Sequence, residues 1–381
     1  MSYQWPPEAK DLFAERYPQM VNAGLPAPDV DAVRAATTDM WADEPGGWVH
    51  QWSALAARYA SAGSHDLAAL AYGWARFPTL ADGAKRAALA RQTEEYLLAA
   101  PGFALPFRRD VLDLPHRGGL TRVPVHVLTP PAVAEKGPVL LVSGGVDSWK
   151  MDVHGLLTAL CAHTGLLTAL CAHTGLLTAL CAHTGLPVVA FDIPGTGDSQ
   201  VPMSPDGAEI VRGLIGHART LGNGIVVHVG ISMGGHCSAR SGLAGEADAA
   251  IVLGGPVEAA FDDGRLARFG MDGIVGNALG FDRQPSPDAL FAALAAFSLR
   301  PLLDQEGQAP MLVVNGADDV HVPQEDTLVF EGRRATEVHL LPDTGHCAVT
   351  RLPEVLEIIS EWLPRTLSTL QAGPGAVEPA T

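Results

Sequence analysis

The sequence predicts an α/β fold, with a mostly parallel sheet of about eight strands and a separate helical domain ahead of it. Short runs of Val, Ile and Leu alternate with helical segments from about residue 109 to residue 370. This alternation is typical of parallel sheets covered by helices on both faces. The aromatic residues are distributed unevenly, because all five Tyr and five of the seven Trp lie before residue 100. The chain therefore divides into two parts of different composition.

The aromatic-rich segment, residues 1–105, is expected to be a helical domain. Apolar side chains recur there at helical spacing, on one face that includes Trp52, Leu55 and Tyr59. A repeat of three or four residues indicates an amphipathic helix. Pro101-Gly102 and Pro106 then interrupt the pattern, since these residues break helices. With 381 residues, 47% of them hydrophobic, the chain is long enough for this domain and a larger second one.

The second domain is expected to span residues 106–372. Its candidate strands are the apolar runs at 111–114, 123–128, 139–142, 188–191, 225–229, 250–253, 311–314 and 337–341. Candidate helices lie at 208–221, 233–243 and 353–370. The segment 256–305 has helical character between two strands, and we expect it to form a lid over a site. The last residues, 373–381, are expected to be a disordered tail.

A decapeptide occurs three times without a substitution, from Gly155 through Thr184. Ten residues are too few for the known solenoid repeats. One copy already supplies a helix between the strands at 139 and 188. We therefore expect one copy to pack on the sheet and the other two to project outward, where their leucines would be buried against the helical domain or a partner subunit. Each copy carries a Cys-x-His pair, but zinc sites usually draw ligands from separate elements, so we predict no metal site.

Composition excludes several classes of function. The formal charge of −17 is unfavourable for nucleic acids and for anionic membrane surfaces. No apolar stretch reaches the ~18 residues of a membrane span, and the N-terminus lacks the pattern of a secretory signal. Three of the five Cys belong to the repeat, so a disulfide framework is not expected. A cytoplasmic protein that binds a small molecule is the prediction.

The strongest motif is Gly230-Ile-Ser232-Met-Gly234, which follows the apolar run at 225–229 directly. A strand, a sharp turn and a helix with this G-x-S-x-G spacing hold a serine in a strained, exposed position. Glycines on both sides allow the tight turn, and the helix N-terminus favours developing negative charge. The motif predicts that Ser232 is a nucleophile.

A serine nucleophile needs a base, and the base needs an orienting acid. Asp319 follows the strand at 311 and His346 follows the strand at 337, so the order is Ser, Asp, His. The spacing from Gly316 to Pro323 favours Asp319 over its neighbour Asp318 as the acid. His321 is a candidate base of lower rank, since no strand end directly precedes it.

The oxyanion of a tetrahedral intermediate needs two backbone N–H donors. We expect the Met233 N–H, next to the nucleophile, to be one. Gly145, in the loop after the strand at 139, supplies the other, with Val146 as the alternative. The glycine-rich segment from Asp192 to Ser199 is expected to shape the wall of the site rather than to take part in the chemistry.

These motifs together resemble the α/β-hydrolases across residues 109–370. Three features are similar to the FrsA-like esterase branch of that superfamily, which includes 2,6-dihydroxypseudooxynicotine hydrolase and polyketide-shortening pigment hydrolases. They are the Trp-rich helical domain, the segment from Gly144 to Asp152, and the segment from Phe191 to Gly197. The resemblance implies a helical domain that helps to close the pocket, and often a homodimer. The tripled decapeptide departs from the family, which has one copy.

The predicted function is a serine hydrolase without metal or cofactor, acting on a mostly apolar small molecule. A carboxylic ester or a lactone is the leading substrate class. Hydrolysis of a C–C bond beside a ketone, in a polyketide-like or aryl ketone, is the alternative that the resemblance leaves open. A non-catalytic ligand-binding protein on the same fold is a third hypothesis, which the intact motifs disfavour.

Overall fold

The computed structural model describes residues 8–103, 105–129, 137–155, 186–262, 265–268 and 270–372. All three copies of the decapeptide lie outside these residues, except for Gly155 at the start of the first, and so does the tail at 373–381. The expectations for the repeat and for the tail therefore stay predictions.

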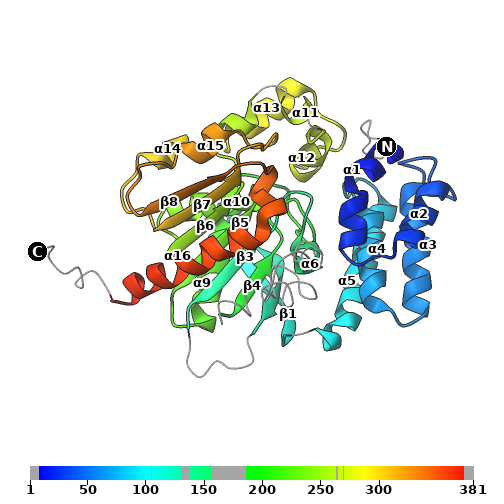
Figure 1. Cartoon of the computed structure of the whole chain (residues 1–381), viewed down its shortest axis with the longest axis horizontal. Helices are drawn as coiled ribbons and strands as arrows, with labels where there is room; N and C mark the ends of the chain where they lie inside the picture. The colour runs from blue at the N-terminus through cyan, green and yellow to red at the C-terminus, as the bar shows by residue number, and fades with distance from the viewer. Residues whose placement is uncertain are drawn as a thin grey trace, which may run out of the picture.

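Eight strands form one sheet in the order β1-β2-β4-β3-β5-β6-β7-β8 (Figure 1). They are β1 Phe107–His116, β2 Gly119–Leu128, β3 Val139–Ser143, β4 Val188–Phe191, β5 Val226–Ile231, β6 Ala249–Leu253, β7 Met311–Gly316 and β8 Thr336–Leu341. β3 to β8 are parallel to one another, whereas β2 is antiparallel to both of its neighbours. The predicted eight-stranded, mostly parallel sheet is confirmed.

The first two strands are longer than the sequence pattern indicated. β1 begins at Phe107 rather than at 111, and β2 begins at Gly119 rather than at 123. Arg117 and Gly118, both with positive φ, form the turn that joins them into a hairpin. This hairpin is only partly buried, so its outer residues do not show the continuous apolar run that marks the central strands.

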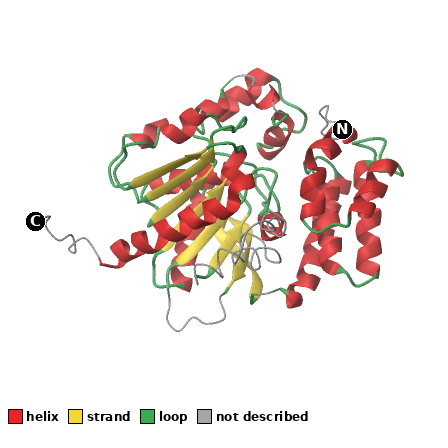
Figure 2. Ribbon diagram, viewed as in Figure 1, coloured by secondary structure: helices red, strands yellow, loops and turns green. Residues whose placement is uncertain are grey.

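Helices cover both faces of the sheet, which gives three layers (Figure 2). On one face, α16 (Leu352–Ala372) packs Val355, Ile359 and Trp362 against the central strands. On the other face lie α9 (Gly207–Leu221) and α10 (Met233–Leu243), which bury residues such as Leu214 and Leu243. The central strands are almost entirely buried and mostly apolar because both of their faces are covered.

The N-terminal part of the chain is a bundle of helices beside the sheet (Figure 1). Its members are α1 Ala9–Asn22, α2 Ala27–Ala36, α3 Trp48–Ser61, α4 His65–Arg76 and α5 Gly83–Ala99, followed by the short η1 Ala100–Gly102. Several of the described aromatic residues of this segment form the core of the bundle, among them Phe13, Trp48, Trp52 and Trp74. Trp48 and Trp52 are fully buried, and their ring centroids lie 5.8 Å apart. The Trp48 indole N–H donates to the Trp74 carbonyl at 2.7 Å, so the buried polar atom is satisfied.

Between β6 and β7 the chain forms a helical segment over the carboxyl end of the sheet (Figure 1). It contains η2 Ala259–Phe261, α11 Arg265–Arg268, α12 Asp272–Ala278, α13 Pro287–Ala295 and α14 Arg300–Leu303. Its base is closed by a hydrogen bond of 3.0 Å from the Leu299 N–H to the Val257 carbonyl. The Leu80 N–H of the bundle donates to Asn277 of α12 at 3.1 Å. The segment therefore contacts both parts of the molecule.

Asp326 holds the start of this segment. It lies in α15 (Gln324–Leu328), is 3% exposed, and accepts four backbone hydrogen bonds from consecutive residues. The donors are the N–H groups of Val257, Glu258, Ala259 and Ala260, at 2.9–3.0 Å. One carboxylate thus satisfies a whole turn of buried backbone.

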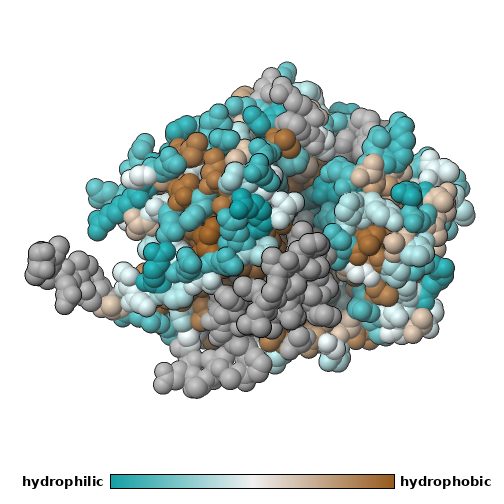
Figure 3. Space-filling view, viewed as in Figure 1, coloured by the Kyte–Doolittle hydropathy of each residue, from teal (hydrophilic) through white to brown (hydrophobic). Residues whose placement is uncertain are grey.

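The surface in Figure 3 is mostly hydrophilic, with apolar side chains gathered beside the edge of the sheet near α14 and α15. Leu328 of α15, 36% exposed, belongs to the apolar residues of this region. Among the described residues, no helix is both long enough and apolar enough to cross a membrane.

Candidate active site

Ser232 lies at the turn between β5 and α10, with φ 57° and ψ −124°. This conformation is strained for a residue with a side chain. Two glycines make the turn sterically feasible, because a Cβ at Gly230 would overlap the Gly234 carbonyl, and one at Gly234 would overlap the Ser143 carbonyl. The Ser232 N–H donates to the Leu253 carbonyl of β6 at 2.7 Å. The serine is thereby held at the carboxyl end of the central strands.

The three residues that the sequence singled out lie in one chain of hydrogen bonds. The His346 Nε2 is 2.8 Å from the Ser232 Oγ, and its Nδ1 is 2.7 Å from the Asp319 Oδ2. The residues come from three loops that follow β5, β7 and β8, which meet at the same edge of the parallel sheet. Serine and carboxylate therefore face opposite nitrogens of one imidazole.

Between the two neighbouring carboxylates, only Asp319 faces the histidine. Its side chain is almost fully buried, whereas Asp318 is exposed. The Asp319 Oδ1 accepts the N–H groups of His321 at 2.8 Å and of Val322 at 3.1 Å. The side chain is consequently fixed, with the Oδ2 directed at His346.

Asn315, at the end of β7, is a site residue that the sequence analysis did not single out. Its Nδ2 donates to the Asp319 Oδ2 at 2.9 Å, and its Oδ1 accepts the Cys347 N–H at 3.0 Å. The amide thus links the loop of the acid to the loop of the base. A polar residue that ends an otherwise apolar, fully buried strand was the available signal.

Electrostatic interactions favour the ion pair between the acid and the base. Burial disfavours the charge on Asp319, but the hydrogen bond and the charge of His346 outweigh it and lower the pKa of the carboxyl group. Burial also opposes charge on His346, yet its contacts with Cys347 and Asp319 raise the pKa of the imidazole well above 6.5. An imidazolium formed at this position is therefore stabilised.

The backbone of Gly145 lies against the serine, as expected for an oxyanion donor. A Cβ at this position would come 3.2 Å from the Ser232 Cβ and 3.5 Å from its Oγ. Within the described residues, neither the Gly145 N–H nor the Met233 N–H donates to a backbone carbonyl. Neither group is therefore engaged by a backbone carbonyl of the described chain, and the role of the two N–H groups as oxyanion donors stays a prediction. The alternative donor, Val146, follows in the same buried loop.

His321, the other candidate base, lies beside His346. Its ring is 5.3 Å from that of His346, centroid to centroid and nearly perpendicular. Burial, followed by the neighbouring charge of His346, lowers the pKa of His321. The imidazole that contacts both the Ser232 Oγ and the Asp319 Oδ2 is that of His346.

Solved structures of the same architecture were found by comparison of the fold. AbyA5 superposes with a TM-score of 0.71 at 20% identity, covering 98% of this chain and 100% of the other. The 2,6-dihydroxy-pseudo-oxynicotine hydrolase superposes with a TM-score of 0.65 at 20% identity, covering 92% and 95%. The chain has the α/β-hydrolase fold. The helical bundle belongs to the shared architecture, since both superpositions extend over more than nine-tenths of this hydrolase-fold chain.

No family model matches the sequence, and no curated protein matches it either.

Proposed function

We propose that the protein is a serine hydrolase that cleaves a carboxylic ester or a lactone through an acyl-enzyme on Ser232. The observation that carries this proposal is the hydrogen-bonded chain from Ser232 through His346 to Asp319, with two backbone N–H groups beside the serine. The fold agrees with it, because the three side chains stand on the three loops that carry such a triad in α/β-hydrolases.

In the proposed reaction, His346 takes the proton of Ser232 as its Oγ attacks the carbonyl carbon. The carbonyl oxygen becomes an oxyanion, which accepts hydrogen bonds from the N–H groups of Gly145 and Met233. His346 then gives the proton to the leaving alkoxide, and the C–O bond of the ester breaks. A water molecule, deprotonated by His346, then attacks the acyl-enzyme, and His346 returns this proton to the Ser232 Oγ as the bond from the Oγ to the acyl carbon breaks and the acid is released. Asp319 stabilises the imidazolium in both halves of the cycle.

The space along the helix that follows the nucleophile is mostly apolar and agrees with a small apolar substrate, but Ser232 and His346 do not line it, and Arg240 does. A cavity of about 100 Å³ begins at Met233, the residue after the nucleophile, and runs along α10. Its walls include Ile193, Met203 and Phe297, together with the ring of His236. Burial lowers the pKa of His236 to about 4, so this ring is neutral at pH 7 and adds no charge to the cavity.

Hydrolysis of a C–C bond beside a ketone is the second candidate, consistent with the resemblance to the FrsA-like branch. The same serine, base and oxyanion donors would serve it, but the leaving group would be a carbon atom that His346 protonates. The products distinguish the two reactions, because only ester or lactone cleavage releases a hydroxyl group from the leaving side.

The proposal is tested by labelling with a fluorophosphonate probe and by assays on a panel of small esters, lactones and aryl ketones. We expect the probe to react at Ser232, identified by peptide mass spectrometry, and Ser232→Ala to lose several orders of magnitude in kcat. Ser61→Ala, at an exposed serine of the bundle, is the matched control. Full activity in Ser232→Ala would refute the proposal. A homodimer and a cytoplasmic location stay predictions.

A further inference from the structure

We propose that Arg76, in the helical bundle, is a positioning residue for the oxyanion loop, so that the bundle contributes to the reaction as well as to the shape of the site. The oxyanion loop is defined here as residues 143–152, between β3 and the end of the first turn of α6 (Lys150–Gly155). This inference rests on the proposed hydrolase function. Arg76 itself does not touch the reacting atoms and acts through Trp149 and Asp152.

The oxyanion loop is compact, and the indole of Trp149 braces it from within. The Trp149 Nε1–H donates to the Val146 carbonyl at 3.1 Å, one residue beyond the proposed donor Gly145. The loop also turns so tightly that a Cβ at Gly144 would overlap the Ser148 carbonyl. A displacement of Trp149 would therefore be transmitted to the peptide units beside the nucleophile.

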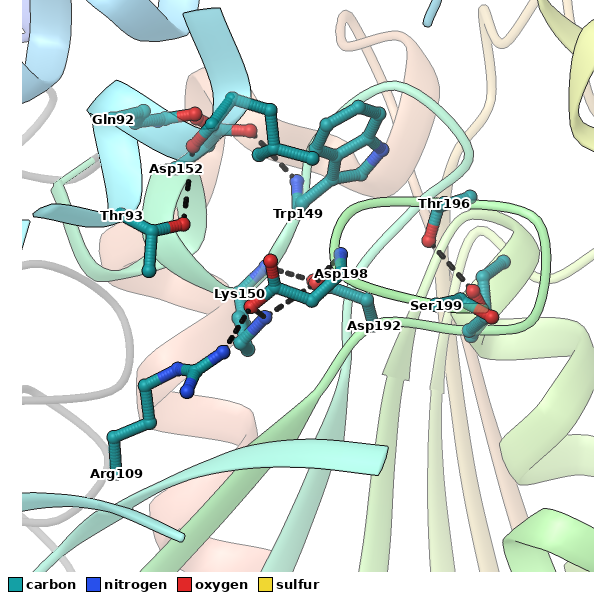
Figure 4. A network of polar contacts seen from close by, with 12 residues as sticks. Gln92, Thr93, Arg109, Trp149, Lys150, Asp152, Asp192, Thr196, Asp198 and Ser199 are labelled. Atoms are coloured by element: carbon teal, nitrogen blue, oxygen red, sulfur yellow. Dashed lines mark hydrogen bonds and ion pairs between the residues drawn. The ribbon is translucent and has the colours of Figure 1, made fainter. Parts of the chain in front are cut away.

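Arg76 fixes Trp149 and Asp152 from the side of the bundle. It ends α4, is 1% exposed, and its guanidinium lies over the Trp149 ring, 3.4 Å from the centroid. It also forms an ion pair with Asp152. The same carboxylate accepts the Trp149 N–H at 2.8 Å and the Gln92 amide at 3.2 Å. Figure 4 shows Gln92, Trp149 and Asp152 gathered at this point.

From the other side, Lys150 fixes the oxyanion loop to the catalytic domain. Its ammonium group is fully buried and lies 2.5 Å from Asp192 and 2.8 Å from Asp198. Figure 4 shows the three side chains directed at one another. Burial disfavours this charge, but the two carboxylates outweigh it and raise the pKa of Lys150. Two ion pairs with buried cations thus hold the segment between Gly145 and Asp152. One joins Asp152 to Arg76 of the bundle, and the other joins Lys150 to Asp192 of the catalytic domain.

The bundle has a second contact with the same loop, because Arg16 of α1 pairs with Asp147 at 3.3 Å. Hydrogen-bond donors stabilise a transition state only when they already point at the oxyanion, since reorientation during the reaction costs free energy. Removal of a whole oxyanion donor lowers kcat by roughly 10²–10³-fold in other hydrolases. A loop that has lost the Arg76 anchor but keeps those of Lys150 and Arg16 retains its donors and holds them less accurately, so a smaller loss is expected.

The test compares Arg76→Ala and Arg76→Lys with Arg58→Ala, a control at an exposed arginine of the same bundle that also pairs with an aspartate. The readouts are kcat and KM on a small ester, and the affinity for phenylboronic acid, whose tetrahedral adduct on serine mimics the oxyanion. In Arg76→Ala we expect kcat and boronate affinity to fall together by roughly 10–100-fold, and KM to change by less than about threefold.

Arg76→Lys should recover part of the loss, because it keeps the charge beside Asp152 but not the planar stack on Trp149. Gln92→Leu is a milder variant of the same network, and it should show the same pattern with a smaller amplitude if Arg76→Ala does not fold. Equal kcat and boronate affinity in wild type and in the variants of this network would overturn the inference.

A readout that needs no activity separates this inference from the proposed function. Amide hydrogen exchange of residues 143–149 should accelerate in Arg76→Ala, and should stay at the wild-type rate in Arg58→Ala. If the wild type hydrolyses no substrate of the panel but Arg76→Ala still exchanges faster than Arg58→Ala, the proposed function is contradicted and the anchoring by Arg76 is supported. Unchanged exchange in Arg76→Ala would refute the anchoring, whatever the activity.

Discussion

Asp319→Asn is the substitution whose consequence the structure specifies most completely. An asparagine at this position has one carbonyl oxygen and one NH₂ group in place of two equivalent oxygens. The Oδ1 position receives the N–H groups of His321 and Val322, so the carbonyl oxygen has to stay there. The NH₂ group is then placed where the Oδ2 was, facing the Nδ1 of His346 and the amide of Asn315.

This orientation forces His346 into the unproductive tautomer. An NH₂ group donates, so the Nδ1 must accept, and the proton of the neutral imidazole moves to the Nε2. That nitrogen then faces the Ser232 Oγ as a donor and cannot take its proton. The corresponding substitution in another serine hydrolase lowers kcat about 10⁴-fold, which equals roughly 5 kcal/mol of transition-state stabilisation. We expect a loss of that order here.

The assay is kcat on the best ester of the panel, with the rate of fluorophosphonate labelling as a second measurement. Asp318→Asn is the matched control, because this neighbouring carboxylate is exposed. It should stay within about threefold of wild type. If Asp318→Asn loses as much activity as Asp319→Asn, or if Asp319→Asn stays within tenfold of wild type, the assigned acid is wrong.

Three further outcomes are expected. Because the pKa of His346 is raised and the base must be neutral, kcat/KM should rise with pH through a midpoint above 6.5. A midpoint at or below 6.5 would contradict the ion pair with Asp319. The stability that the raised pKa contributes is fully present below about pH 6.5, and it is lost as pH rises through the pKa of His346 in the folded protein. Gly197→Ala should lower the free energy of unfolding by about 3 kcal/mol or more, because φ is 49° there and the added Cβ would overlap the buried carboxylate of Asp192. Gly224→Ala is the control, with φ 97° and open space around the added Cβ, and should lower it by about 1 kcal/mol. Equal losses in denaturant unfolding would show that the overlap at residue 197 is relieved. Asp326→Ala should lower the free energy of unfolding by about 2–4 kcal/mol, because four backbone N–H groups lose their acceptor. Glu325→Ala, at an exposed neighbour, should change it very little. Similar unfolding midpoints for the two variants would refute the role of Asp326 in holding the segment between β6 and β7.

The central strands, and the loops that bring Ser232, Asp319 and His346 together, were accessible from sequence for a common physical reason. Strands covered on both faces must be apolar throughout, so β3 to β7 are visible as continuous runs, and the loops that follow them can be placed in order. The spacing of glycines around Ser232 reflects steric requirements of the turn, which leave few alternatives. The strands and the turn at Ser232 could therefore be predicted, because each depends on residues that are close together in the sequence.

Features that depend on contacts between distant segments were not predictable in this way. Asn315 gains its importance from a loop 32 residues further along the chain, and Arg76 from a carboxylate 76 residues away. Lys150 lies in the segment from Gly144 to Asp152 that resembles the FrsA-like branch, but nothing in a single sequence pairs it with Asp192 and Asp198. Such pairings are set by the tertiary fold, which brings together residues whose own neighbourhoods carry no periodic signal.

The hydrogen bond between Val257 and Leu299 affects how the segment between β6 and β7 can vary in length and sequence. Val257 and Leu299 are hydrogen-bonded to each other, so everything between them leaves and re-enters the domain at nearly one point. An insertion whose ends meet can lengthen, shorten or be exchanged as a cassette with a small entropic penalty and without a shift of the sheet. Changes confined to residues 258–298 would therefore leave the strands and the loops that carry Ser232, Asp319 and His346 in place.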